Sequence, residues 1–160
     1  MQQISSAVTA KSRYSVKNLL MALIPDASAI ISLAFDDEDG TYARAVIEAI
    51  AADQAFVPTL FWFEVRNTLL MGERRKRNTP DQTTAFLADL ALLPFEIDSQ
   101  PREAAVLNLA RRHELTIYDA AYLELAQRKS LPFATVDRAL VRAAEAAGVI
   151  VWKAINAETG

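Results

Sequence analysis

The chain has 160 residues, one histidine, no cysteine and a formal net charge of −3 at pH 7. That length favours a single domain with its own hydrophobic core, and the absence of cysteine excludes disulfides and thiolate metal sites. One histidine also argues against a histidine-rich zinc site or a Ser-His-Asp triad. Any bound metal must therefore take mostly oxygen ligands, which suits Mg²⁺ or Mn²⁺.

The two ends of the chain differ from its middle. Residues 1–20 have no sustained hydrophobic period and lack the apolar core of a secretory signal. We expect a disordered N-terminal extension at 1–20, one folded domain at 21–153 and a short tail at 154–160. No apolar run reaches the roughly 18 residues that a membrane span needs. The sequence therefore predicts a cytoplasmic protein with no membrane partner.

Strands and helices are expected to alternate from residue 23 onward. In chain order, the predicted elements are a strand at 23–26, helices at 28–33 and 41–52, a strand at 55–57, helices at 60–75 and 80–93, a strand at 95–97, helices at 101–113 and 116–128, a strand at 131–135, a helix at 138–147 and a strand at 149–152. One helix start is well marked, because Thr79, Pro80 and Gln82 fit a capping box with proline at the first helical position. This alternation predicts a mostly parallel sheet with helices on both faces.

Three aspartates stand where predicted strands give way to helices. Asp26 and Asp137 each end a strand, and Asp119 lies in the first turn of a helix that follows a short apolar approach. Each has a purely structural explanation as a helix cap or first-turn acid. Parallel strands nevertheless bring their carboxyl ends to one edge of a sheet, where ligands bind in open α/β folds. We expect these three side chains to meet there.

Glu64 is harder to explain by local structure. It lies within an apolar run, 60–65, on a predicted helix, and a buried ionised carboxylate is costly unless something compensates its charge. Arg66 is two positions away and points to another side of the helix. The partner is then either a metal ion or a cation from another helix. Four carboxylates gathered together repel one another, and a divalent cation removes that penalty.

Four segments together resemble a known family. They are IPDAS at 24–28, FEVRNTL at 63–69, LTIYDAAY at 115–122 and ATVDRAL at 134–140. In this order they resemble the PIN domain, and more narrowly the VapC-type toxins of type II toxin–antitoxin systems. The resemblance implies a three-layer α/β/α sandwich at 21–153 that acts as a metal-dependent endoribonuclease.

The resemblance also implies site residues and partners. Asp26, Glu64 and Asp119 are expected as direct ligands of Mg²⁺ or Mn²⁺, and Asp137 as a ligand through water or of a second ion. Thr135 matches the small catalytic hydroxyl beside the last acid, Ser28 a near-metal position, and Arg138 is a candidate to neutralise phosphate charge. The implied partners are an RNA substrate, a cognate antitoxin and a second copy of the chain in a homodimer. Core burial is the default expectation for Trp62 and Phe63.

Two alternatives remain at the level of sequence. A catalytically silent PIN-like module would bind RNA or a protein partner without cleavage. A phospho-accepting receiver domain would use Asp26, Asp98, Thr135 and Lys153, all at suitable places. That second alternative lacks the usual acid beside Asp26 and leaves Glu64 and Asp119 unexplained.

Overall fold

The computed structural model describes residue 4 and residues 21–154. Apart from Ile4 and Ala154, the extension predicted at 1–20 and the tail predicted at 154–160 lie outside the described residues. Ile4 itself is buried and belongs to the hydrophobic core. Every helix within the described ranges is too short or too polar to cross a bilayer.

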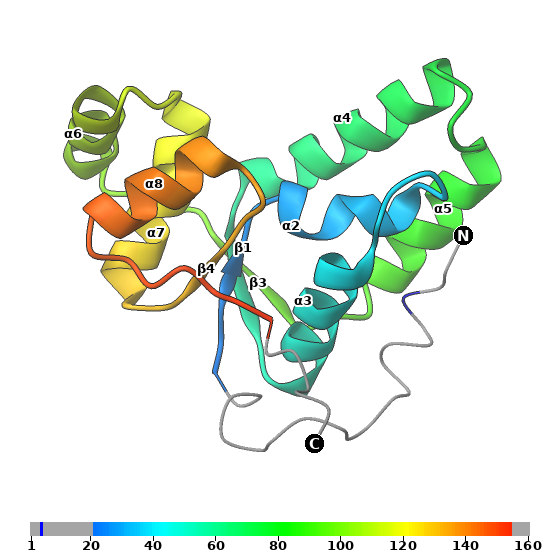
Figure 1. The fold of residues 1–160 in the computed structure, drawn as a ribbon, viewed down its shortest axis with the longest axis horizontal. Coiled ribbons are helices and arrows are strands. Elements are labelled where there is room, and N and C mark those ends of the chain that lie inside the picture. The colour runs from blue at the N-terminus through cyan, green and yellow to red at the C-terminus, as the bar shows by residue number, and fades with distance from the viewer. Residues whose placement is uncertain (1–3, 5–20, 155–160) are drawn as a thin grey trace.

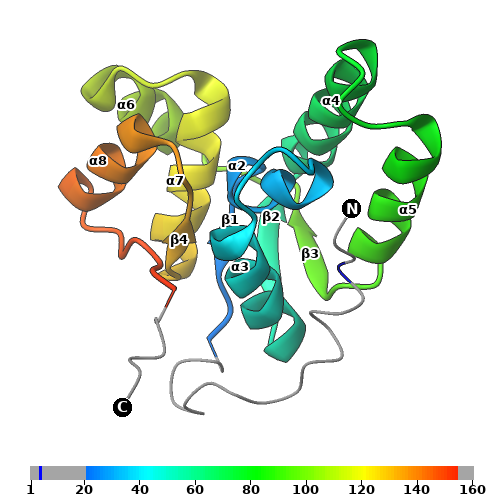
Figure 2. The same ribbon diagram turned by 45° about the vertical axis from the view of Figure 1, so that its right-hand side comes forward.

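Helices and short strands alternate, as the sequence predicts. The elements are β1 (Ile24–Pro25), α2 (Ser28–Ile31), the 3-10 helix η1 (Ser32–Ala34), α3 (Thr41–Ala52), β2 (Ala55–Pro58), α4 (Leu60–Arg74), α5 (Pro80–Leu90), β3 (Phe95–Asp98), α6 (Glu103–His113), α7 (Ile117–Lys129), β4 (Phe133–Ala134) and α8 (Arg138–Ala146). Figures 1 and 2 show α6, α7 and α8 on one side of the strands and α2 to α5 on the other. The predicted α/β/α layering is confirmed.

The strands follow the spatial order β3-β2-β1-β4, and every pair is parallel. Four residue pairs join β2 to β3, whereas β1 meets β2 only at the bridge from Leu23 to Ala55. Pro25 explains the short contact, because the N–H groups of Ile24 and Asp26 face β4 and the next donor toward β2 would belong to the proline. The pairing of β1 with β2 therefore stops before Asp26.

The predicted last strand, 149–152, is wrong in extent. Only Val151 forms a parallel bridge, to Phe133, with hydrogen bonds of 2.8 Å from Phe133 N to Ile150 O and from Trp152 N to Phe133 O. β4 itself is only two residues long, so it offers little ladder for a further strand. The Tyr42 hydroxyl holds this segment as well, donating to the Trp152 carbonyl at 3.3 Å.

Helix α7 lies at the centre of its layer. Seven consecutive residues, 120–126, are buried, so this helix has no solvent-facing stripe over two turns. It contacts β1 and β2 on one side and α6 and α8 on the others. The only charged residue in this stretch, Glu124, accepts a hydrogen bond from Arg128 Nε at 2.7 Å, which balances its buried charge.

Helix α4 buries the face predicted for it, through Phe61, Val65 and Leu69. Phe63 is 70% exposed, so the expectation that it enters the core is wrong. On a helix, Phe63 points about 160° away from Val65, which places it opposite the buried face. Trp62 is half-buried and packs its ring against Phe61 and Phe95.

The far end of α4 is clamped to the loop that follows η1. Gly72 lets the helix approach the Phe35 ring, since a Cβ there would lie 2.5 Å from Phe35 Cε1. Arg77 lies over the same ring, 4.0 Å from its centroid, and pairs with Asp37 at 2.7 Å and Glu38 at 2.6 Å. The acidic loop thus fixes how α4 crosses the molecule, and α4 carries Glu64.

Candidate functional site

Asp26 follows β1 directly, and its buried carboxylate is hydrogen-bonded on both oxygens. Oδ1 accepts from Ser28 Oγ at 2.6 Å and from Ala29 N at 2.9 Å, while Oδ2 accepts from Thr135 Oγ1 at 2.5 Å. Burial raises the pKa of Asp26 above its ordinary value, the bonds from Ser28 and Thr135 oppose that shift, and the charge of Asp137 adds to it. The Thr135 bond ties the end of β1 to the end of β4.

Asp137 caps helix α8, as its position before that helix predicts. Its Oδ1 accepts from Ala139 N at 2.7 Å and from Leu140 N at 3.1 Å. The Asp137 N–H in turn donates to Thr135 Oγ1 at 3.1 Å. Thr135 therefore sits between Asp26 and Asp137 and contacts both.

Asp119 lies in the first turn of α7 and shares a reciprocal contact with the helix cap. Thr116 Oγ1 accepts from Asp119 N at 3.1 Å and donates to Asp119 Oδ2 at 2.7 Å. The structural role considered for Asp119 is thus real. All three aspartates stabilise the start of a helix, and those helix starts bring them to the same edge of the sheet.

Glu64 is half-buried on α4, and a tyrosine hydroxyl rather than a cation faces it. Tyr122 of α7 donates to Glu64 Oε2, and no lysine or arginine in the described part of the chain forms an ion pair with this carboxylate. Burial raises the pKa of Glu64, the Tyr122 bond opposes that shift, and the charges of Asp26 and Asp119 add to it.

Sequence reasoning missed Tyr122. One signal for it was present, because Tyr122 stands three positions after Asp119 and residues at that spacing share a helix face. The residue that it contacts is 58 positions away, and no local pattern indicates such a pairing.

Charge repulsion links the four acids predicted from sequence in a chain. The charge of Asp137 raises the pKa of Asp26, and the charges of Asp26 and Asp119 raise the pKa of Glu64. Among the residues that the structure describes, however, no three acidic or histidine side chains lie close enough to surround one ion. The donor chemistry fits a hard divalent cation, because every donor is oxygen. Mg²⁺ suits this spacing, since it commonly binds through one or two carboxylates and keeps several waters.

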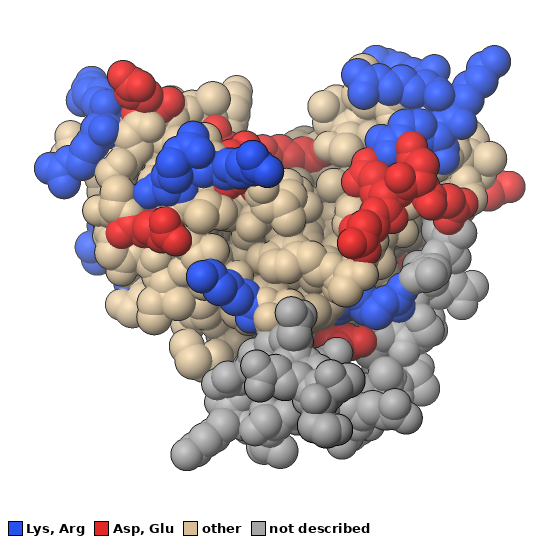
Figure 3. Space-filling model, viewed as in Figure 1, with Lys and Arg blue, Asp and Glu red and all other residues tan. Residues whose placement is uncertain are grey.

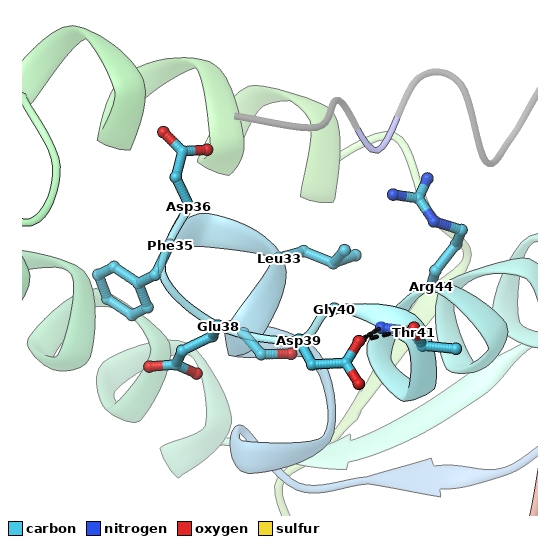
Figure 4. A pocket seen from close by; sticks show the side chains of 9 residues that line it. Leu33, Phe35, Asp36, Glu38, Asp39, Gly40, Thr41 and Arg44 are labelled. Carbon is cyan, nitrogen blue, oxygen red and sulfur yellow. Dashed lines mark hydrogen bonds between the residues drawn. The ribbon is translucent and has the colours of Figure 1, made fainter.

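A second acidic group lies apart from this site and has structural partners. Of the acidic run at 36–39, Asp36, Glu38 and Asp39 line a pocket between η1 and the start of α3 (Figure 4). Asp39 accepts from Thr41 N at 2.9 Å and Thr41 Oγ1 at 2.6 Å, and those bonds lower its pKa. Asp37 is paired with Arg77, which lowers the pKa of that carboxyl.

Asp98, which the receiver-domain alternative requires, is engaged elsewhere. It accepts from Arg128 Nη1 and Nη2 at 3.0 and 3.1 Å and lies 3.7 Å from Lys129 Nζ. These pairs lower the pKa of Asp98, with the Arg128 hydrogen bonds as the largest cause. Asp98 thus joins β3 to the end of α7, and nothing in the geometry favours the receiver-domain alternative.

Comparisons with known proteins agree with this geometry. The family model described as PIN domain matches residues 23–146. Ribonuclease VapC3 of Pyrobaculum aerophilum is 32% identical over 124 residues, which cover 75% of this chain and 92% of that protein. The crystal structure of PAE2754 from the same organism is similar with a TM-score of 0.58, at 27% identity, and covers 77% of this chain and 87% of that one. FitAcB from Neisseria gonorrhoeae shares the fold, with a TM-score of 0.57 at 16% identity over 82% of this chain and 96% of that one.

Proposed function

The chain belongs to the PIN domain family, and on that premise we propose that it is an endoribonuclease that hydrolyses RNA phosphodiester bonds with the help of Mg²⁺ or Mn²⁺. The observation that carries the proposal is the grouping of Asp26, Glu64, Asp119 and Asp137 at one edge of the sheet, where the charges of neighbouring aspartates raise the pKa values of Asp26 and Glu64. The relation to ribonuclease VapC3 supports RNA as the substrate.

The carboxylates would hold the cation in unequal ways. A bound divalent ion would lower the pKa of a water and hold the scissile phosphate. Asp26, Glu64 and Asp119 are the proposed direct ligands. Because no three described acids surround one point, a bound ion would draw these side chains closer together or reach one of them through water. Asp137, whose Oδ1 caps α8, is the proposed ligand through water. Thr135 and Ser28 fix both oxygens of Asp26 in place, so this carboxylate enters the reaction already oriented.

The basic surface supports an RNA substrate. Figure 3 shows a hollow between two arms, of which α4 forms one and α6 and α8 form the other (Figure 1). Lysine and arginine side chains lie at the top of each arm, and acidic side chains are visible between the arms. Arg77 and Arg128 form ion pairs that hold elements of the fold together. No ion pair within the described part of the chain involves the exposed basic residues on the arms. These exposed basic residues are Arg74, Arg75 and Lys76 on one arm and Arg111, Arg112, Arg138 and Arg142 on the other.

Arg138 is the proposed neutraliser of phosphate charge. It is exposed, directly follows the capping acid Asp137, and lies in the first turn of α8. A phosphate that reaches the carboxylates at the strand ends would pass this turn, where a guanidinium group and the helix start both favour negative charge. The single-stranded part of an RNA is the expected target, because its bases can be splayed out.

Two protein partners complete the proposal. The first is a cognate antitoxin that masks the acidic site, and the relation to ribonuclease VapC3 supports it. The second is another copy of the chain. Phe63 is 70% exposed and Leu70 is 45% exposed, and since they stand seven positions apart they share one face of α4. Arg66 and Asn67 lie between them on this face, and exposed apolar groups bordered by polar ones are a feature of interaction sites.

A nuclease assay on the purified full chain tests the proposed function. Wild type should cleave a single-stranded RNA when Mn²⁺ or Mg²⁺ is present and not in EDTA. Asp26→Asn keeps the shape of the side chain but loses its charge, so cleavage should fall on the order of a hundredfold or more. Asp53→Asn is the matched control, because Asp53 is exposed and stands before β2, at the opposite edge of the sheet.

Either of two results would contradict the proposal. Cleavage that is equal in wild type and Asp26→Asn would mean that another protein or another site is responsible. RNA binding by wild type without any cleavage at saturating Mn²⁺ would instead support the catalytically silent module.

A further inference from the structure

Tyr122 is a buried residue of α7 whose side chain carries one polar atom, the hydroxyl oxygen. The residue is 1% exposed, and its ring lies 6.3 Å, centroid to centroid, from the ring of Phe133 in β4. Because Tyr122 follows Asp119 by three positions, the two side chains lie on the same face of the helix. The core therefore fixes the ring, and the hydroxyl points toward the acidic edge.

The hydroxyl links two helices that belong to opposite layers. It donates to Glu64 Oε2, so it joins α7 to α4 across the edge of the sheet (Figure 1). No other described residue donates to the Glu64 carboxylate, and Oε1 has no partner among the described residues. With Oε2 held, the rotation of the carboxylate is set and Oε1 is the oxygen left to bind a ligand.

The choice of acceptor separates this hydroxyl from an ordinary buried one. A buried tyrosine hydroxyl needs some partner, and Tyr42 meets that need with the carbonyl of Trp152. Tyr122 instead bonds a carboxylate that is half-buried and is repelled by Asp26 and Asp119.

We propose that Tyr122 is a positioning residue, which orients the Glu64 carboxylate for the divalent cation of the site. This inference rests on the proposed function, since that function supplies the cation. Partners that hydrogen-bond to a metal ligand fix its orientation, and their removal commonly weakens metal binding about 10- to 100-fold. The same bond sets the position of α4 relative to α7, so it also controls where Glu64 stands with respect to Asp119.

Mn²⁺ titration calorimetry on the full chain tests the proposal without any nuclease assay. Tyr122→Phe keeps the ring and removes only the hydroxyl, so we expect the Kd for Mn²⁺ to rise about 10- to 100-fold. Tyr118→Phe removes a hydroxyl from the same helix at a side chain that is 64% exposed, and its Kd should equal that of wild type. Circular dichroism in EDTA should show the same helix content in all three proteins at the temperature of the titration.

The Mn²⁺ dependence of cleavage is a second measurement. It would not change if Tyr122 only supported the fold. In Tyr122→Phe, the Mn²⁺ concentration for half-maximal cleavage should rise by the same factor as the Kd, while KM for RNA at saturating Mn²⁺ stays unchanged. An unchanged Kd for Mn²⁺ in Tyr122→Phe would overturn the proposal. So would a Kd that rises equally in Tyr118→Phe.

Results that contradict the proposed function can be distinguished from results that contradict the role of Tyr122. A wild type that binds Mn²⁺ but cleaves no RNA would contradict the ribonuclease assignment, and the comparison of Kd values would still decide the role of Tyr122. A wild type that binds no Mn²⁺ would overturn the role of Tyr122 together with the metal site.

Discussion

Burial and charge compete most directly at Glu64. The side chain is half-buried, and this burial is the largest cause of its raised pKa. The charges of Asp26 and Asp119 raise the pKa further. The contact that favours its charged form is a neutral hydroxyl, that of Tyr122. The sequence left open whether a metal or a cationic side chain compensates the charge of Glu64. In the structure, no described lysine or arginine forms an ion pair with it. Compensation of Glu64 by a metal ion stays a prediction, which the next experiment tests.

Glu64→Gln distinguishes a metal ligand from a core residue. Glutamine keeps the shape and still accepts from Tyr122, and it relieves the repulsion by Asp26 and Asp119. The metal-free variant should therefore melt at or above the temperature of wild type. Mn²⁺ at a hundred times its Kd should stabilise wild type by about 2.7 kcal/mol, which is several degrees in Tm for a chain of this size. That gain should vanish in Glu64→Gln, as measured by thermal unfolding with EDTA or Mn²⁺.

The opposite pattern would mean that Glu64 has a structural role. A variant that melts far below wild type in EDTA, yet gains normally from Mn²⁺, would show that the charge of Glu64 supports the fold and does not bind the ion.

At the level of elements, the site depends on how α4 crosses the sheet. Glu64 lies in the first half of α4, and the second half is fixed by the close approach of Gly72 to Phe35. Asn78, buried after the helix, donates to the Leu69 carbonyl at 3.3 Å and to Thr83 at 2.8 Å, which ties the turn between α4 and α5. A change far from the acids can therefore move one of them.

Gly72→Ala should destabilise the protein, although alanine is the better helix former by about 1 kcal/mol. A Cβ at this position would clash with Asn78 Oδ1 and lie 2.5 Å from Phe35 Cε1. Overpacking of this kind costs about 1–3 kcal/mol. Urea denaturation should show the loss, while Arg74→Ala, at an exposed position of the same helix, should stay within about 0.5 kcal/mol of wild type. A Gly72→Ala protein that is more stable than wild type would refute the close approach.

The tie between β3 and α7 predicts a dependence on pH. Asp98 is bonded to Arg128, which lowers its pKa below the ordinary 3.8 in the folded protein. An acid with a lowered folded pKa contributes stability above its unfolded pKa and loses it as the pH falls through the folded value. Asp98→Asn should thus cost about 1–2 kcal/mol at pH 7, and the difference from wild type should shrink once the pH drops below 3.8.

Denaturation in urea at a series of pH values measures this, with the exposed Asp53→Asn as control. A difference between wild type and Asp98→Asn that stays constant down to the lowest pH at which both fold would mean that the charge of Asp98 contributes nothing.

At the level of the whole molecule, the net charge of −3 hides a strong separation of charge. Lysine and arginine side chains lie at the tops of the two arms, and acidic side chains are visible between the arms and on the right-hand arm (Figure 3). Under the proposed function, this arrangement would draw an RNA to the arms and admit it to the acids once a cation neutralises them. An antitoxin that supplies positive charge to the same hollow would compete with both.

Expression without a partner tests the toxin assignment. If the chain is a free ribonuclease, its induction in a bacterial host should slow growth, and Asp119→Asn should relieve the effect by weakening the metal site. Growth curves, with immunoblots to confirm equal protein levels, measure the difference. Equal toxicity of wild type and Asp119→Asn would argue against a nuclease toxin.

The sequence determined the features whose causes are local. Apolar runs and their breaks predicted the order of elements, and the capping box at Thr79 and Gln82 is present in the structure. The three aspartates could be placed because each stands at a helix start, a position that is legible within four residues and that parallel strands bring to one edge. Whether they bind a metal stays a prediction.

Only the tertiary structure decided the features whose causes are distant along the chain. Residues 120–126 of α7 are buried because two helices and the sheet enclose them. The apolar residues of this stretch are typical of a helix buried all round, but they do not identify the elements that cover it. Phe63 faces outward because packing selected another face of α4, although its neighbours in sequence are equally apolar. Tyr122 and Glu64 meet across 58 positions. Local propensity acts through residues a few positions apart, whereas such a contact forms only when whole layers pack, so it is fixed by the fold.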